Sequence, residues 1–554
     1  MLPIPTSRWS RRRSGSGNRG RRKAAKIAAA GVALTLGVLG TAQLAGAHSL
    51  SSDDNKHHGA SHHKKLQKTR DEKQKEQKPS KSGSGGNSDA STGAYSSTPA
   101  ASTSVTSAGM GTGDTRHIIE PTVPSRICAA LTANLVGTSL PTAAPDTSRI
   151  QRALDSCQTS SGQVAVELKA QGGYNAFLSG ALKIHKGEVL LVDSNVTLYG
   201  SLNPADYQVP GGPTCGTLDS TGEGCNPLID VPGDAVNAGV EGVRAADGSQ
   251  GRIDGQGGQT MSGKSETWWQ LARDAGKANK KQNVPRTLVA QGDNFTLYHI
   301  DLLNSPKFHV TFKNANGMTA WGVRILTPSN ARNTDGIDPS GSSNVTINDS
   351  YISTGDDCIA IKAAAPSKNI TVENTHCYGT HGLSIGSETN GGLTNVLFQN
   401  DTLDGIGATG IPSTLDSGLR IKSSGKNGGK VANVTYNTIC LRNVQQPLVF
   451  DTHYADGGSG SNIPYYTGIT VSNVTATHSP SGASSVFDGY DAAHPLGVTL
   501  NNVTLDATAS TAQYAKITTS NSNISPAGTD VTVFASSGGA GSGDSCSFPA
   551  FPGL

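Results

Sequence analysis

The sequence has no long apolar run, no CxxC pair and few aromatic residues. Its apolar run 28–39 is shorter than the ~18 or more residues that a membrane-spanning helix needs. Without a CxxC pair, the cysteines do not show the common spacing of a zinc site. Aromatic residues make up 5% of the 554 residues, whereas glycine occurs 68 times. This balance is typical of many short strands joined by turns rather than of a helical bundle.

Positive charge is scarce outside the N-terminal tail. The net formal charge is +3, but residues 1–82 hold 18 Lys and Arg against 5 Asp and Glu. The rest of the chain therefore holds 27 basic residues against 37 acidic ones. Because the basic character belongs to the tail, we expect no nucleic-acid partner. A folded part that binds an acidic substrate must do so through a local cluster of cations.

Residues 1–47 have the layout of an export signal. Basic clusters at 11–13 and 21–23 precede the apolar run, and small residues at 45–47 offer a cleavage site. We predict a secreted, extracellular protein with no stable membrane insertion. An uncleaved membrane anchor is the alternative.

Residues 48–116 are low in complexity, rich first in His and Lys and then in Gly, Ser and Thr. They hold too few apolar residues to offset the entropy cost of ordering the backbone. We predict a disordered linker here, followed by a folded domain over residues 117–554. The paired histidines at 57–58 and 62–63 could bind a metal, but a solvated tail is the simpler interpretation.

Eight cysteines behind an export signal favour disulfides over metal binding. The sequence leaves their connectivity open. The candidate pairs are Cys215 with Cys225, which would close a small loop, Cys128 with Cys157, Cys358 with Cys377, and, by elimination, Cys440 with Cys546.

The helical spacing of apolar residues is confined to a short stretch near the start of the folded domain. Residues 147–157 (TSRIQRALDSC) place Ile150, Leu154 and Cys157 on one helical face. We predict one amphipathic helix that caps the N-terminal end of the strand-rich region. Beyond it, the pattern changes to short alternating strands, as at 189–192 and 196–198.

From residue 294 onward, short strands recur with a period in the twenties and occasional longer turns. Their first residues are Phe295, Met318, Val345, Ile370, Val396, Val434, Ile469 and Val498. Such a period argues for a solenoid, and no long helices separate the strands. We predict an all-β fold, a single-stranded right-handed parallel β-helix with rungs ~4.8 Å apart. An antiparallel β-sandwich is the alternative, but its strands would recur every ~8–12 residues.

In a β-helix, chemically active residues one turn apart lie on one face. Seven residues arrive in phase with the repeat: Asp335, Asp356, Asp357, His381, Arg420, Lys422 and Tyr454. Taken singly, each has a structural interpretation as a turn, loop or surface residue. Stacked carboxylates repel one another, so the pKa of at least one must rise. A neutral acid beside ionised ones suits general acid–base hydrolysis of a glycosidic bond, and the nearby cations suit a negatively charged sugar.

Four short motifs carry a family resemblance. Asn-Thr-Asp (333–335), Gly-Asp-Asp (355–357), His-Gly (381–382) and Arg-Ile-Lys (420–422) resemble the signature motifs of the polygalacturonases, glycoside hydrolase family 28, in family order. The resemblance covers residues 117–554. The stretches 384–392 and 447–454 resemble bacterial endopolygalacturonases in particular. Thr380 stands where the family usually has glycine.

The resemblance implies a pectin-lyase-like solenoid that cleaves α-1,4-galacturonosyl bonds of polygalacturonate, acting within the chain and with inversion. It implies no cofactor, no metal, and a monomer. The implied roles are Asp356 as general acid, Asp335 and Asp357 as holders of the attacking water, His381 as tuner of the acid, and Arg420, Lys422 and Tyr454 as substrate-binding residues. Inversion rests on the resemblance alone, because neighbouring rungs would bring the carboxylates closer than the ~6.5–9.5 Å that inversion requires.

Other functions remain possible for such a scaffold. An exo-acting polygalacturonase, or another pectin-degrading hydrolase, would share most of the site. A rhamnogalacturonan hydrolase would lack part of the Asp-Asp and His set, and a pectate lyase would need calcium and an arginine base. A non-catalytic adhesin or wall-binding protein would need no acidic stripe.

Overall fold

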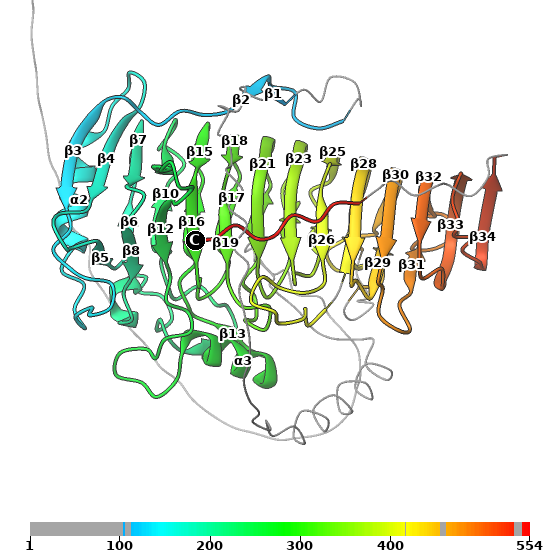
Figure 1. Ribbon diagram of the computed structural model, residues 1–554. Coiled ribbons are helices and arrows are strands. Elements are labelled where there is room, and N and C mark those ends of the chain that lie inside the picture. The colour runs from blue at the N-terminus through cyan, green and yellow to red at the C-terminus, as the bar shows by residue number, and fades with distance from the viewer. Residues whose placement is uncertain (1–103, 106–111, 416, 455–460, 537–545) are drawn as a thin grey trace, which may run out of the picture. The chain divides into compact units, whose positions relative to one another are not determined.

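The computed structural model describes residues 104–105, 112–415, 417–454, 461–536 and 546–554. The predicted export signal 1–47, the histidine pairs and most of the predicted linker lie outside the described residues. The described chain coils so that each turn adds a strand to three parallel sheets (Figure 1). The fold is an all-β, right-handed parallel β-helix, the hand that parallel strands with their crossovers almost always adopt.

Sheet 1 carries the candidate site. Its strands are β6 (Leu182–Lys183), β10 (Ile229–Val231), β14 (Leu288–Ala290), β17 (Val310–Lys313), β20 (Ile337–Ser340), β22 (Ile359–Ile361), β24 (Leu383–Ile385), β27 (Ser417–Lys422), β29 (Gln446–Asp451), β31 (Ser485–Asp488) and the start of β33 (Ser510–Ser520).

Sheet 2 holds the strands in which the repeat is visible in the sequence. They are β3 (Ile127–Thr132), β4 (Val164–Lys169), β7 (Glu188–Val192), β11 (Gly239–Gly242), β15 (Phe295–Tyr298), β18 (Asn316–Trp321), the first parts of β21 (Ser343–Ser353), β23 (Ser367–Tyr378), β28 (Lys430–Arg442), β30 (Tyr465–Thr477) and β32 (Leu496–Leu505), then β25 (Leu393–Gln399), the rest of β33, and β34 (Gly528–Ala535).

Sheet 3 closes each turn. It holds β5 (Ala176–Ser179), β8 (Thr197–Gly200), β12 (Gly251–Asp254), β16 (Ile300–Leu303), β19 (Arg324–Leu326), β26 (Thr402–Asp404) and the second parts of β21, β23, β28, β30 and β32. Two short antiparallel pairs lie outside the three sheets: β1 (Ser104–Val105) with β2 (Ile118–Ile119), and β9 (Leu218–Asp219) with β13 (Lys281–Gln282).

The sequence alignment of the repeat is confirmed at every step. Each of its eight positions lies directly opposite the next in the parallel register of sheet 2, as Val345 lies opposite Ile370 and Ile370 opposite Val396. All pairings in the three sheets are parallel, so the antiparallel sandwich is wrong for the described residues. Residues at alternate positions, such as Val345 and Ile347, are fully buried in the interior.

Asparagines occupy the same position of the turn that leads into sheet 2 on successive rungs. Asn344, Asn369 and Asn395 each have a φ of 54 to 59°. Asparagine tolerates this left-handed conformation better than most residues. Their side chains form a ladder, because the amide of Asn369 donates to Asn344 at 3.1 Å and that of Asn395 donates to Asn369 at 3.2 Å. The ladder satisfies polar groups that the stacking of turns would otherwise leave without partners.

The predicted capping helix is confirmed as α2 (Thr147–Cys157), with Ile150, Leu154 and Cys157 buried. A second helix, α3 (Trp268–Ala278), was not predicted, although Thr267 caps its first turn and Asn279 ends it in a left-handed conformation. The signal was present: Trp268, Leu271, Ala272 and Ala275 follow helical spacing and are buried. A 3₁₀ turn at Pro204–Tyr207 lies against α3 through Tyr207 and Trp268.

All four candidate disulfides are confirmed. The pairs are Cys128–Cys157, Cys215–Cys225, Cys358–Cys377 and Cys440–Cys546. The last one ties the C-terminal segment 546–554 to β28. That segment runs back across the strands of sheet 3, where Tyr378 donates to the Pro549 carbonyl at 2.8 Å and Arg324 donates to the Gly553 carbonyl at 2.9 Å (Figure 1).

A second segment that covers the β-helix begins before residue 117, where the sequence predicts the start of the folded domain. The Asp114 carboxylate accepts a hydrogen bond from Thr346 at 2.8 Å, and Arg116 donates to the Met318 carbonyl at 2.7 Å. Ile118 then packs on Tyr298 and Trp321. The ordered contacts therefore begin a few residues before 117, because this segment covers the outer side of sheet 2. No helix among the described residues is long and apolar enough to cross a membrane.

Glu241, on β11, is buried beside Tyr298, and its two carboxylate oxygens have no hydrogen-bond partner among the described residues. Burial raises the pKa of Glu241 to about 8. Its folded-state pKa thus lies above the unfolded value, so folding favours the protonated form. Below about pH 4.5 the side chain is protonated in both states, so its burial does not reduce the free energy of unfolding through ionisation. As the pH rises toward 8 the unfolded state ionises first, and the free energy of unfolding falls.

We expect Glu241→Gln, which resembles the protonated side chain, to leave Tm near the wild-type value at pH 4 and to raise it by several degrees at pH 8. Thermal unfolding followed by circular dichroism at both pH values measures this. Asp234→Asn, which removes the charge of an exposed carboxylate, is the control and should change neither value. An equal or smaller gain at pH 8 than at pH 4 would contradict the burial of an ionisable Glu241.

Candidate active site

The register of sheet 1 brings the predicted site residues together on successive rungs. Ile337 lies opposite Ile359, and Ile359 lies opposite Leu383. The turn between the first two is therefore 22 residues long, so Asp335 aligns with Asp357 rather than with Asp356 as a 21-residue turn implied. A backbone hydrogen bond from Gly336 to the Asp357 carbonyl, 3.0 Å long, connects these two rungs.

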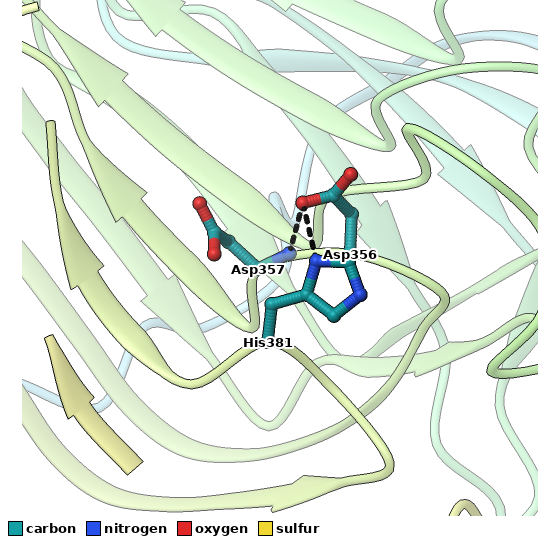
Figure 2. A group of neighbouring side chains, drawn as sticks. All are labelled: Asp356, Asp357 and His381. Atoms are coloured by element: carbon teal, nitrogen blue, oxygen red, sulfur yellow. Dashed lines mark hydrogen bonds and ion pairs between the residues drawn. The ribbon is translucent and has the colours of Figure 1, made fainter. Parts of the chain in front are cut away.

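Asp356 is paired with His381 (Figure 2). Its Oδ1 lies 3.0 Å from His381 Nδ1 and accepts a 2.9 Å hydrogen bond from the Asp357 amide. The other ring nitrogen of His381 lies 3.0 Å from the Thr414 hydroxyl. Burial by itself would raise the pKa of Asp356, but His381, Lys422 and the Asp357 amide together hold it well below its usual range.

Asp357 faces the predicted cations. Lys422 Nζ lies 2.8 Å from its Oδ2, Arg420 Nη1 lies 3.6 Å from its Oδ1, and the Ser384 hydroxyl donates to Oδ1 at 2.8 Å. In Figure 2 the carboxylate of Asp357 points away from that of Asp356. Because the two carboxylates face different partners, the adjacent pair serves two different sides of the site.

Asp335 is the acid of the site whose pKa is raised. It is 3% exposed, and its Oδ1 has no hydrogen-bond partner among the described residues, while Lys362 Nζ lies 3.4 Å from its Oδ2. Burial, then the charges of Asp356 and Asp338, raise the pKa of Asp335 well above its usual range, although Lys362 opposes this. The predicted rise in the pKa of one stacked acid therefore falls on Asp335.

Arg420 and Lys422 lie on β27, on the rung after His381. Arg420 is aligned with Ser384 rather than with His381, so the cations lie further along their strand than the histidine. Both project toward one ring: Arg420 Cζ lies 5.1 Å and Lys422 Nζ 5.4 Å from the centre of Tyr454. Both are buried, yet nearby Asp357, Asp356 and Tyr454 keep their pKa values above the ordinary ones despite burial. The structure thus gathers all seven predicted residues.

Residues that the sequence prediction did not assign also contact the acids. Asn333, with a φ of 56°, donates to Asp356 Oδ2 at 3.4 Å, and its own side-chain oxygen accepts from Gln282 on β13 at 3.1 Å. Asn333 belongs to a recognised motif, so the sequence could have revealed it. Gln282 and Ser384 carry no local signal, because their roles arise from strands that meet only in the folded chain.

Thr380, the departure from the family motif, fits without a left-handed backbone. Gly379, one residue earlier, has a φ of 62°, and a Cβ there would meet the Ser329 hydroxyl at 2.1 Å. Thr380 has no positive φ, and its carbonyl accepts from the Ser413 hydroxyl at 2.9 Å. Glycine is therefore required at 379 and not at 380.

The acids and the histidine do not form a good metal site. Ligand atoms of Asp356, Asp357 and His381 lie within 4.8 Å of one another. However, a cation there would lie beside the Lys422 ammonium, which already contacts Asp357. This set of side chains favours charge-assisted hydrogen bonds among its own members over the binding of a divalent ion.

The chain matches the sequence model of Glycosyl hydrolases family 28 over residues 231–525, more than half of its length. The chain belongs to this family. It is 39% identical to a polygalacturonase of Ralstonia solanacearum over 446 residues, covering 71% of this chain and 80% of the relative. It is 40% identical to an endo-polygalacturonase of Pectobacterium carotovorum subsp. carotovorum over 405 residues, covering 72% of this chain and 91% of the relative.

A solved structure matches as well. The polygalacturonase from Erwinia carotovora ssp. carotovora superposes with a TM-score of 0.63 at 37% sequence identity, covering 75% of this chain and all of that one. The predicted family is thereby confirmed, and this family 28 protein is a glycoside hydrolase with the predicted β-helix fold.

The pairing of Asp356 with His381 yields a prediction. We expect His381→Ala to raise the pKa of Asp356 by about one unit or more, since it removes both the main opposing charge and a hydrogen bond. Carbon-13 NMR titration of labelled aspartate carboxyls measures the change. Thr414→Val is the matched control, because it removes the other contact of His381 and leaves the pair with Asp356 intact. An unchanged pKa in His381→Ala would show that the pair does not control the acid.

Proposed function

We propose that this family 28 hydrolase is a secreted polygalacturonase that cleaves α-1,4-galacturonosyl bonds within polygalacturonate chains, with inversion. One observation carries the proposal: three buried carboxylates on two adjacent rungs lie beside two buried cations that face the same aromatic ring. The first group suits acid–base chemistry on a glycosidic bond, and the second suits a sugar that bears a carboxylate.

Arg420 and Lys422 supply the recognition of the acidic sugar. Nε of Arg420 is buried without a hydrogen-bond partner among the described residues. A buried donor of this kind is costly unless a ligand satisfies it. A galacturonate carboxylate would accept from the planar guanidinium and from the Lys422 ammonium, while Tyr454 holds both cations in place.

Asp356 serves as the general acid in this proposal. In the free protein Asp335 is the more readily protonated of the two acids, because burial and the charges of Asp356 and Asp338 raise its pKa, whereas His381 and Lys422 lower the pKa of Asp356. Lys422 is one cause of the low pKa of Asp356. A substrate carboxylate paired with Lys422 would offset that positive charge, so substrate binding itself favours protonation of Asp356. Transfer of the proton from Asp335 to Asp356 would leave the Asp335 carboxylate able, together with Asp357, to orient and activate the attacking water.

Secretion and endo action rest on separate support. Four disulfides suit an oxidising compartment, in agreement with the export signal expected at 1–47. Detection of the mature chain in culture medium, beginning near residue 48, tests the first. Endo action is supported by the similarity to a relative named as an endo-polygalacturonase.

We expect Asp356→Asn to lower kcat for reducing-sugar release from polygalacturonate by about 10²–10⁴-fold, because it removes the acid. A galacturonate oligomer with an aryl leaving group of low pKa needs little protonation, so Asp356→Asn should regain most activity on it. Asp335→Asn, the matched control, should regain none. The opposite pattern would assign the acid to Asp335, and no reducing-sugar release by the wild type would refute the hydrolase proposal.

The products offer a second prediction. We expect polygalacturonate to yield a ladder of intermediate oligomers early in the reaction, since an endo enzyme cuts within the chain. Chromatographic sizing over time, with proton NMR of the newly formed ends, measures both length and anomer. The first products should carry the β configuration, as inversion of an α bond requires. Monomer or dimer alone from the start would indicate an exo enzyme, and α products would indicate retention.

A further inference from the structure

The two oxygens of the Asp356 carboxylate have different surroundings. Oδ1 accepts a hydrogen bond from the Asp357 amide and lies 3.0 Å from His381 Nδ1. Oδ2 accepts from the side-chain amide of Asn333 at 3.4 Å. Because Oδ1 already faces two neighbours, Oδ2 is the oxygen that can carry a proton to a leaving group. The contact with Asn333 therefore acts on the atom that the proposed general acid uses.

The side chain of Asn333 can meet Asp356 in two orientations. An amide has a donor NH2 at one end and an acceptor oxygen at the other, and a half turn of the group exchanges them. With the NH2 toward Oδ2, the contact stabilises the ionised carboxylate. With the oxygen toward Oδ2, it would repel the ionised carboxylate and accept a hydrogen bond from the protonated one. The orientation of this amide thus influences the protonation of the acid.

Gln282 decides between the two orientations. Its Nε2, which can only donate, lies 3.1 Å from the side-chain oxygen of Asn333. Turning Asn333 alone would bring its NH2 against the NH2 of Gln282, so the pair resists the change. Gln282 carries no charge, and its influence on Asp356 therefore passes through hydrogen bonding.

The two-stranded pair of β9 and β13, outside the three sheets, holds Gln282 in place. Gln282 is 4% exposed and lies on β13, which pairs with β9. The next residue, Asn283, extends the pairing, because its backbone amide donates to the Thr217 carbonyl at 2.9 Å. The disulfide Cys215–Cys225 closes the loop that contains β9. Gln282 therefore approaches Asn333 from a covalently closed loop and not from the rungs that carry the acids.

We propose that Gln282 is a positioning residue for the general acid: it holds the oxygen end of Asn333, so that the NH2 end is aimed at Asp356 Oδ2. The inference rests on the proposed function, in which Asp356 is that acid. Gln282 acts through Asn333 and not by contact with the reacting atoms. With Oδ1 held by its own neighbours, the carboxylate is then fixed at both oxygens.

Gln282→Met tests this proposal, because methionine has a similar shape and no amide. We expect the alkaline limb of the pH profile of kcat on polygalacturonate to move up by about half a unit, since the ionised acid loses a hydrogen bond. At the optimum, kcat should fall about fivefold and KM should change less than about twofold. The charged residues that surround Asp356 are unchanged in this variant: His381, Lys422, Arg420, Asp335 and Asp357.

A matched control and a double-mutant cycle separate positioning from a structural role. Gln259→Met changes an exposed glutamine between β12 and α3, and should leave the profile as in the wild type. If Gln282 acts through Asn333, Gln282→Met should move the limb no further in an Asn333→Ala background. An unmoved limb in Gln282→Met, or an equal shift in both backgrounds, refutes the proposal. Should Gln282→Met lower Tm by more than about five degrees, Gln282→Asn replaces it, because its amide is too short to reach Asn333.

A measurement without turnover separates this inference from the function itself. Carbon-13 NMR titration of labelled aspartate carboxyls should show a higher pKa of Asp356 in Gln282→Met than in the wild type. If the wild type releases no reducing sugar from polygalacturonate, the proposed function fails, and the titration still tests the effect of Gln282 on Asp356. If the wild type is active and neither the pKa nor the alkaline limb moves, only the positioning role is refuted.

Discussion

The lateral hydrogen bonding of one turn to the next is the constraint on which the rest of the structure depends. Each turn of the coil must return to the same register, so that Val345 lies opposite Ile370 and Ile370 opposite Val396. From β4 onward, turns of different length are accommodated by loops between the sheets, whereas the pairing of β3 with β4 contains one shift of register between Ile127 and Ala129. A slip of one residue would turn the buried positions outward, which the apolar interior forbids.

This register also creates the site and its electrostatic tension. Acids that are far apart in the sequence, such as Asp335 and Asp357, arrive on adjacent rungs and must share a small, buried volume. The repulsion is relieved in two ways: the pKa of Asp335 rises, and cations on neighbouring rungs compensate Asp356 and Asp357. The rungs that bring the acids together thus also supply the cations that compensate their negative charges.

The stack needs protection at its sides as well as along its length. α2 covers the first turns, the segment around Asp114 covers sheet 2, and the C-terminal segment tied by Cys440–Cys546 covers sheet 3. Parallel sheets are normally buried on both faces, and these segments serve that purpose here. Burial is unfavourable at Glu241, whose carboxyl has no hydrogen-bond partner within the part of the chain that the structure describes.

The sequence by itself indicated the phase of the repeat, the capping helix, the candidate disulfide partners and, with the family resemblance, the candidate site residues. It could do so because side-chain alternation and turn length are local properties that a regular stack multiplies. Only the tertiary structure decided which acid has its pKa raised, because the burial and the neighbouring charges at Asp335 come from several rungs at once. It also decided the contacts of Asn333 with Gln282 and with Asp356. Those contacts join loops and rungs of unequal length, so no spacing along the chain encodes them.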